Sequence, residues 1–188
     1  MAEALIKEKK KIHPHKFTLW VGIGSIVMMF AGLTSAYIVK RNQANWVSFE
    51  LPQEFWFSTC VMVLSSISVI MALRKFKERK MKQYRMLMTT SLSLGVLFIL
   101  LQYVGFFHLW NAGITLQASV SYSFLYVIVG LHAVHVLGGV LAIAFMLLRS
   151  FSDRTKHYST VPVELVNTYW HFVDLLWIYL LVFLIMIK

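Results

Sequence analysis

Cysteine is nearly absent from this chain, which has a single one, Cys60, among its 188 residues. One thiol cannot form a disulfide within the chain, and it cannot supply the several thiolates of a zinc or iron–sulfur site. Because Cys60 lies inside an apolar stretch, we expect it to be a small buried apolar residue. Disulfide-stabilised and cysteine-ligated folds are therefore excluded.

Motifs for common enzyme chemistry are missing as well. The chain has no Gly-rich phosphate-binding loop, no HExxH pair and no Ser/His/Asp nucleophile pattern. It also has no low-complexity tract and no linker rich in Pro, Gly or Ser. These absences argue against a hydrolase or an ATP-driven pump, and they favour one domain without a second, soluble unit.

Apolar residues, by contrast, are abundant: 59% of the chain is hydrophobic and its mean hydropathy is +0.68. A soluble domain of this length has too much surface to carry such a composition, so the chain needs a bilayer as its solvent. Helices satisfy their own backbone hydrogen bonds in lipid, whereas the alternating pattern of a membrane barrel is absent. The sequence therefore predicts an all-α membrane protein, a bundle of five transmembrane helices at about 17–39, 54–73, 86–108, 123–148 and 165–187.

Charge is one-sided, with 18 Lys and Arg against 8 Asp and Glu. Fifteen of the basic residues fall on the side of the amino terminus and three fall on the other side. By the positive-inside rule, we expect the N-terminus inside and the C-terminus outside. Residues 1–16 are then a basic cytoplasmic segment, and 17–188 form a single transmembrane domain. The basic residues are topology signals rather than a surface for nucleic acid.

Small residues gather in the first and fourth predicted helices. Gly, Ala and Ser at a helix surface let two backbones approach closely, so we expect these two helices to lie inside the packing. The residues are Gly22, Gly24, Ala31, Gly32 and Ser35 in the first helix and Gly130, Ala133, Gly138, Gly139 and Ala142 in the fourth.

Polar residues inside the apolar runs are the candidates for function. His132 and His135 are three positions apart in the fourth helix and so share a face. His171 and Asp174 repeat this spacing in the fifth helix, and Glu164 lies seven residues before His171, near the inner end. A carboxylate in the middle of a bilayer costs at least about 2.5 kcal/mol. We therefore expect Asp174 to face protein and to pair, with a histidine as the natural partner.

Three roles are compatible with this set. One is a polar network in which histidines donate to Asp174 or to carbonyl groups and fix the helix packing. Another is a proton-handling cluster, because histidine and carboxyl groups titrate near neutral pH in tuned surroundings. The third is a metal or haem site, because imidazole and carboxylate at helical spacing can ligate iron, copper or zinc. Spacing alone does not choose between them.

Longer motifs give the chain a resemblance to a known family. The stretch YWHFVDLLW at residues 169–177, preceded by Glu164, is similar to the signature of subunit III of the haem–copper terminal oxidases. The H-x-x-H motif in GLHAVHVLG at 130–138 and the L-G-x-x-F-x-x-L-Q element at 94–102 match the same family. The resemblance covers nearly the whole chain from Phe17 onward, and it is to the short bacterial form with five helices.

This resemblance implies a non-redox accessory subunit of a respiratory cytochrome c oxidase in the bacterial cytoplasmic (inner) membrane, within a complex that reduces O2 to water and pumps protons. Haem and copper would belong to partner subunits, and this chain would hold no catalytic, cofactor-binding or metal-ligating residue. It would pack mainly against subunit I, with subunit II as a further partner, bind phospholipid, and support assembly and proton uptake. The residues carried over as a buried polar network are His132, His135, Glu164, Trp170, His171 and Asp174.

The first helix departs from the family pattern. Many members place a carboxylate there, shortly before an F-x-G element that Phe30–Gly32 matches in this chain. The corresponding position is about Ile26, and no acidic residue occurs between Lys16 and Glu50. The lipid or proton role of that carboxylate therefore has no counterpart in this helix.

Alternatives stay open at this point. Subunit III of a quinol oxidase is the nearest, because the electron donor is chosen mainly by subunit II. A stand-alone membrane cytochrome or metalloprotein would use His132, His135, His171 and Asp174 as ligands. A small proton-coupled carrier would transport its substrate without partner subunits.

Overall fold

The computed structural model of the chain describes residues 14–42, 46, 53–151 and 160–187. The elements within these residues are α1 (Pro14–Arg41), α2 (Glu54–Lys77), α3 (Met81–Asn111), α4 (Val120–Phe151) and α5 (Val161–Met186). All five are long and apolar enough to cross a membrane. The prediction of an all-α protein with five spanning helices is confirmed.

Each observed helix is longer than the apolar run that predicted it. Helix α3, for example, covers Met81–Asn111, whereas its apolar run suggested 86–108. A helix continues into the polar interface because its backbone hydrogen bonds do not depend on apolar side chains. Helices α2 and α3 are joined by residues 78–80, where Arg79 takes a φ of 61° and reverses the chain.

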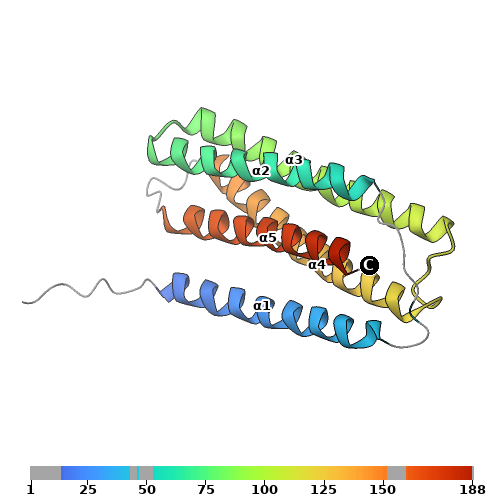
Figure 1. The fold of residues 1–188 in the computed structure, drawn as a ribbon. Helices are drawn as coiled ribbons and strands as arrows, with labels where there is room; N and C mark the ends of the chain where they lie inside the picture. The colour runs from blue at the N-terminus through green and yellow to red at the C-terminus, as the bar shows by residue number, and fades with distance from the viewer. Residues whose placement is uncertain (1–13, 43–45, 47–52, 152–159, 188) are drawn as a thin grey trace, which may run out of the picture.

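Helices α2 and α3 lie side by side, and α5 packs between α2, α4 and α1 (Figure 1). Helix α4 also packs against α3. Among the residues that the structure describes, α1 approaches only α4 and α5, and it lies along the edge of the bundle away from α2 and α3 (Figure 1). Helices α4 and α5 therefore join α1 to the pair α2 and α3.

Trp177 of α5 marks the centre of the packing. Its ring lies 5.7 Å from Phe55 of α2 and 5.3 Å from Phe98 of α3, measured between ring centroids. Its indole nitrogen donates a hydrogen bond of 2.9 Å to the hydroxyl of Thr59 on α2. Aromatic packing of this kind brings three helices together at one side chain.

Trp170 lies about two helical turns before Trp177 on α5. Its ring explains why two neighbouring positions are glycine. A Cβ added to Gly139 of α4 would come within 2.8 Å of the Trp170 ring, and one added to Gly95 of α3 would come within 2.9 Å. No real side chain tolerates such distances, so both helices need glycine where this fully buried indole lies. This agrees with the expectation that α4 lies inside the packing.

The same expectation for the first helix is wrong. A Cβ added at Gly22, Gly24 or Gly32 would meet no described atom within 4 Å. The buried residues of α1 are Ile23, Phe30, Thr34 and Tyr37, which face α4 and α5, and the glycines face outward. Small residues allow close packing, but they do not by themselves show that a neighbour is present.

The prediction that Cys60 is buried is also wrong. Cys60 is exposed on α2, whereas Phe55, Ser58 and Met62 of the same helix are buried. In a bilayer, lipid solvates a small apolar side chain about as well as protein does. Hydropathy therefore does not tell which face of a spanning helix contacts its neighbours.

Candidate functional site

Polar side chains follow one side of α5 from its first turn into the bundle. Glu164, Asn167, His171 and Asp174 are spaced three or four positions apart, which places them along one strip of the helix. The strip begins at the basic end, by which we mean the end of the bundle where α1 and α5 begin and α2 ends. The positive end of the helix dipole favours a carboxylate at Glu164, in the first turn.

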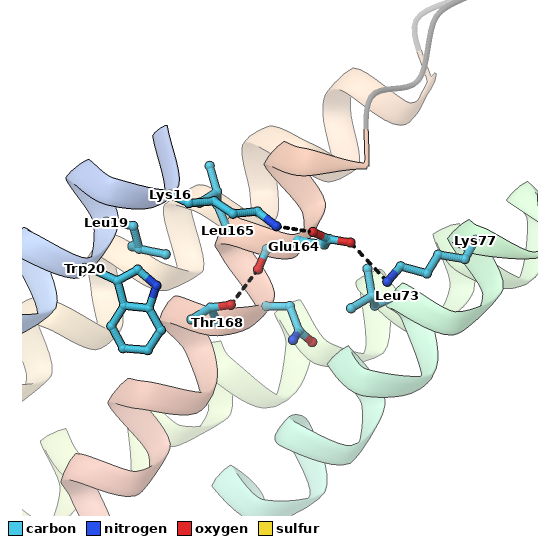
Figure 2. A pocket seen from close by; sticks show the side chains of 9 residues that line it. Lys16, Leu19, Trp20, Leu73, Lys77, Glu164, Leu165 and Thr168 are labelled. Atoms are coloured by element: carbon cyan, nitrogen blue, oxygen red, sulfur yellow. Dashed lines mark hydrogen bonds and ion pairs between the residues drawn. The ribbon is translucent and has the colours of Figure 1, made fainter. Parts of the chain in front are cut away.

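Glu164 joins three helices at the basic end. Its carboxylate accepts from the ammonium group of Lys16 on α1 at 2.9 Å and from that of Lys77 on α2 at 3.0 Å (Figure 2). All three side chains remain partly exposed, so each pair contributes about 0–1 kcal/mol. The two ion pairs hold the ends of α1 and α2 to α5.

A cavity of about 320 Å³ lies beside these ion pairs. Figure 2 shows the lysines reaching Glu164 from opposite sides, with Trp20 and Leu19 of α1 along one wall. Its lining is both charged and apolar, as expected where a membrane helix enters the headgroup region. The lining residues are Lys16, Leu19, Trp20, Leu73, Lys77, Glu164, Leu165, Asn167 and Thr168.

Deeper along the strip, His171 bonds at both ring nitrogens. Nε2 lies 3.2 Å from Oδ1 of Asn167, which also lines the cavity. Nδ1 lies 2.6 Å from the hydroxyl of Ser66 on α2. The imidazole thus lies between a residue of the cavity and a residue of the neighbouring helix.

Asp174 completes this arrangement through the same serine. The Ser66 hydroxyl bonds Oδ2 of Asp174, whereas Nδ1 of His171 is 3.9 Å from that oxygen, too far for a direct hydrogen bond. The other carboxyl oxygen, Oδ1, is buried and has no hydrogen-bond partner among the described residues. The expected pairing of Asp174 with a histidine therefore occurs through an intervening hydroxyl.

His132 and His135 have different neighbours, although they are three positions apart. His132 is fully buried and stacks on Trp177, with 5.1 Å between ring centroids, and neither of its nitrogens has a partner in the described part of the chain. His135 turns toward α1, where its ring meets Phe30 edge-on, and its Nδ1 lies 2.7 Å from the carbonyl oxygen of Leu131.

The structure thus separates the six predicted site residues. His171 and Asp174 share Ser66, Glu164 lies with lysines at the basic end, and His132 lies in the aromatic centre. The indole nitrogen of Trp170 is buried without a partner among the described residues, so this side chain acts through its shape. A single network that includes all six residues stays a prediction. Within residues 14–42, 46, 53–151 and 160–187, no group of three or more His, Cys, Asp or Glu could hold a metal ion.

Sequence reasoning missed the partners of these residues. Asn167 had a signal, because it lies four positions before His171 on the same face of the helix. Lys16 and Lys77 were counted only as topology signals. Ser66 had no signal, since serine is common in membrane helices and many of the described Ser and Thr hydroxyls bond a carbonyl of their own helix.

Comparison with known proteins gives one consistent family. The sequence model of the family described as cytochrome c oxidase subunit III matches residues 44–187. The cytochrome c oxidase subunit 3 of Corynebacterium diphtheriae is 30% identical over 172 residues, which is 84% of this chain and 83% of that protein. The probable cytochrome c oxidase subunit 3 of Nocardia farcinica is 29% identical over 180 residues, 90% of this chain and 89% of the relative. The cytochrome c oxidase subunit 3 of Bacillus subtilis is 24% identical over 167 residues, which is 86% of this chain and 80% of that protein.

Proposed function

Since the chain belongs to the cytochrome c oxidase subunit III family, we propose that it is a non-redox accessory subunit of a respiratory haem–copper oxidase. The observation that carries this proposal is the family match from residue 44 to 187, which includes all of α2, α3, α4 and α5. The complex would take electrons from cytochrome c, as the names of the relatives indicate, reduce O2 to water and pump protons. Haem and copper would be held by its other subunits.

The contacts of the His171 and His132 imidazoles support a role without redox chemistry. His171 is occupied at both nitrogens by Asn167 and Ser66, and His132 is enclosed by aromatic rings. Haem or copper ligation needs a free imidazole nitrogen that faces space for the metal. The arrangement favours imidazoles that fix helices relative to one another, as an accessory subunit requires.

Phospholipid binding is part of the proposal, and the cavity at the basic end supports it. Lys16 and Lys77 carry two positive charges against the single negative charge of Glu164, which leaves a surplus that suits one phosphodiester. Leu19, Leu73 and the Trp20 ring supply the apolar surface that the start of an acyl chain would contact. Native mass spectrometry of the purified complex should show fewer retained anionic phospholipids after K16Q/K77Q. Equal lipid retention would argue against this site.

We further propose that the basic end faces the cytoplasm in a bacterial inner membrane. The bias of basic residues supports this orientation, and most of the described Lys and Arg lie near the basic end. The segment 1–13, Arg154, Lys156 and Lys188, which also entered that count, lie outside the described residues. An impermeant thiol reagent added to intact cells, with Cys60 replaced by Ala, should label a cysteine at Thr115 but not one at Lys80. Labelling at Lys80 from outside would reverse the orientation.

Purification of the tagged chain in mild detergent tests the function itself. We expect subunits I and II to copurify in a constant ratio, together with the haem spectrum of an oxidase. The alternatives predict different results: a stand-alone cytochrome shows a Soret band in the isolated chain, and a carrier transports in liposomes without partners. A chain that purifies alone from cells with an assembled oxidase contradicts the proposal.

A further inference from the structure

Four side chains form a continuous hydrogen-bonded chain from the cavity at the basic end to the buried carboxyl of Asp174. Asn167 lines the cavity and bonds Nε2 of His171 at 3.2 Å. Nδ1 of His171 and the Ser66 hydroxyl are 2.6 Å apart, and the same hydroxyl bonds Asp174. About 30% of the His171 side chain is exposed, compared with 7% of that of Asp174. Side-chain exposure thus decreases along this hydrogen-bonded chain from His171 to Asp174.

Two complete hydrogen-bond arrangements connect these side chains. In the first, Nδ1–H of His171 donates to Ser66, the Ser66 hydroxyl donates to the Asp174 carboxylate, and the Asn167 amide is turned so that its NH2, in place of Oδ1, donates to Nε2. In the second, Asp174 is a carboxylic acid that donates to Ser66, Ser66 donates to Nδ1, and Nε2–H donates to the Asn167 oxygen. His171 is neutral in both arrangements, and they differ by one proton on Asp174 and by the histidine tautomer.

We propose that His171 and Ser66 relay a proton from the cavity at the basic end to Asp174, which holds it inside the bundle. When the Asn167 amide turns away from Nε2, hydronium that enters from the cavity gives a proton to Nε2 and leaves water. The Nδ1–H bond then breaks as Ser66 Oγ takes that proton, and the original hydroxyl proton of Ser66 forms the O–H bond on Oδ2. The charge of the carboxylate is neutralised, the Asn167 oxygen then accepts from Nε2–H, and no other covalent bond changes.

Asp174 is the end of this relay and not a step on a path across the membrane. Its second oxygen, Oδ1, is buried without a partner in the described part of the chain, so the proton has no onward acceptor there. A buried carboxylate with one hydrogen-bond donor is costly, and taking up a proton removes the charge that makes it so. The site is therefore suited to holding a proton.

Other charged and titratable groups lie farther along the helices that pack against α5, namely α1, α2 and α4. Lys16 and Lys77 at the basic end pair with Glu164, and the two histidines of α4 face Trp177 and Phe30. These groups include Lys16 and Tyr37 on α1, Lys77 on α2, His132 and His135 on α4 and Glu164, Tyr169 and Tyr179 on α5. The closest titratable neighbour of Asp174 is His171 on its own helix.

Infrared hydrogen–deuterium exchange of the purified oxidase complex tests the relay. The carbonyl band of protonated Asp174 is identified by its loss in Asp174→Asn, and its deuterium shift is followed after transfer to D2O. We expect exchange to slow by at least about tenfold in Ser66→Ala and to recover in Ser66→Thr, which restores a hydroxyl. Ser65→Ala is the matched control, because Ser65 is an adjacent buried serine that donates instead to the Ser91 carbonyl.

Nitrogen-15 NMR of the unaltered complex gives a second test that needs no substitution. The His171 tautomer should change from Nδ1–H to Nε2–H as the Asp174 band appears on lowering the pH. The relay is overturned by a single His171 tautomer throughout, by the absence of any Asp174 band, or by unchanged exchange in Ser66→Ala.

The inference rests on the proposed function as a subunit of an oxidase complex, yet the two can fail separately. The composition of the purified complex is established before the infrared experiment. Missing oxidase subunits would refute the proposed function, whereas an intact complex with unchanged exchange would refute the relay alone.

Discussion

Helices α1 and α5 lie side by side and are held in the bundle in different ways. Helix α5 has tryptophans and carboxyl groups that contact all four other helices, and both Trp170 and Trp177 are fully buried. Helix α1 contacts its neighbours through the buried rings of Phe30 and Tyr37. The Lys16–Glu164 ion pair at one end and a 3.1 Å hydrogen bond between the hydroxyls of Thr34 and Tyr179 farther along are its polar attachments to α5. The comparison shows that apolar character alone does not determine where a helix packs in this fold. The shapes of the contacting side chains and the pairing of polar groups determine it.

The largest difference between these helices should come from adding one methyl group. Gly139→Ala would bring a Cβ within 2.8 Å of the Trp170 ring, and overpacking of this kind costs about 1–3 kcal/mol. Gly32→Ala on α1 is the matched control, because its Cβ meets open space. The measurement is the free energy of unfolding of the purified chain in mixed detergent micelles. Equal effects of both substitutions would mean that the Trp170 contact does not set the position of α5.

Removal of the buried carboxyl comes next. Asp174→Ala leaves the Ser66 hydroxyl, which also bonds His171, with one partner fewer, at a cost of about 1–3 kcal/mol. We expect a lower yield of assembled complex and a shorter active lifetime, with little change in initial turnover. Thr89→Ala serves as control, since this exposed hydroxyl bonds only a carbonyl of its own helix. An immediate and complete loss of oxygen reduction in an assembled Asp174→Ala complex would contradict this expectation and place the residue in the catalytic path.

The smallest effect is expected at the attachment of α1. Glu164→Gln removes both ion pairs at the basic end, worth about 0–1 kcal/mol each, and high salt should remove most of the difference from the unaltered chain. Spin labels on α1 and α5 should report a larger or broader distance near the basic end. An unchanged distance distribution would show that α1 is held by its other contacts.

Glu78→Gln is a matched control for this experiment. Glu78 also accepts from two lysines, Lys75 and Lys80, but it lies in the connection between α2 and α3 and does not contact α1. Hydrogen bonds from these lysines lower the pKa of Glu78, so its ion pairs persist until the pH falls below the usual glutamate range. The distance between α1 and α5 should not change.

The sequence predicted the elements of this fold better than their arrangement. Apolar runs located all five helices because every spanning segment needs enough apolar length, whatever its neighbours. They could not show that Gly139 faces Trp170 while Gly32 faces outward, or that Cys60 is exposed. In lipid, both faces of a helix are apolar, so amphipathic periodicity carries little information about packing.

The candidate site shows the same limit. Helical spacing correctly placed His171 and Asp174 together, because it needs only the geometry of one helix. Ser66 lies on another helix, and its contact with both residues depends on the angle and register of α2 against α5. Helical spacing likewise could not show that His132 stacks on Trp177, while its neighbour His135 faces α1. Contacts between helices, which give the site its chemistry, require the three-dimensional structure.

Under the proposed function, this chain supports an oxidase without carrying out its redox chemistry. The direct measurement is oxygen consumption over time by purified complexes with and without the chain. We expect the same initial rate in both, and a faster decline of activity during turnover where the chain is missing. A depleted complex that retains its haem and copper but reduces no oxygen from the first turnover would contradict the claim.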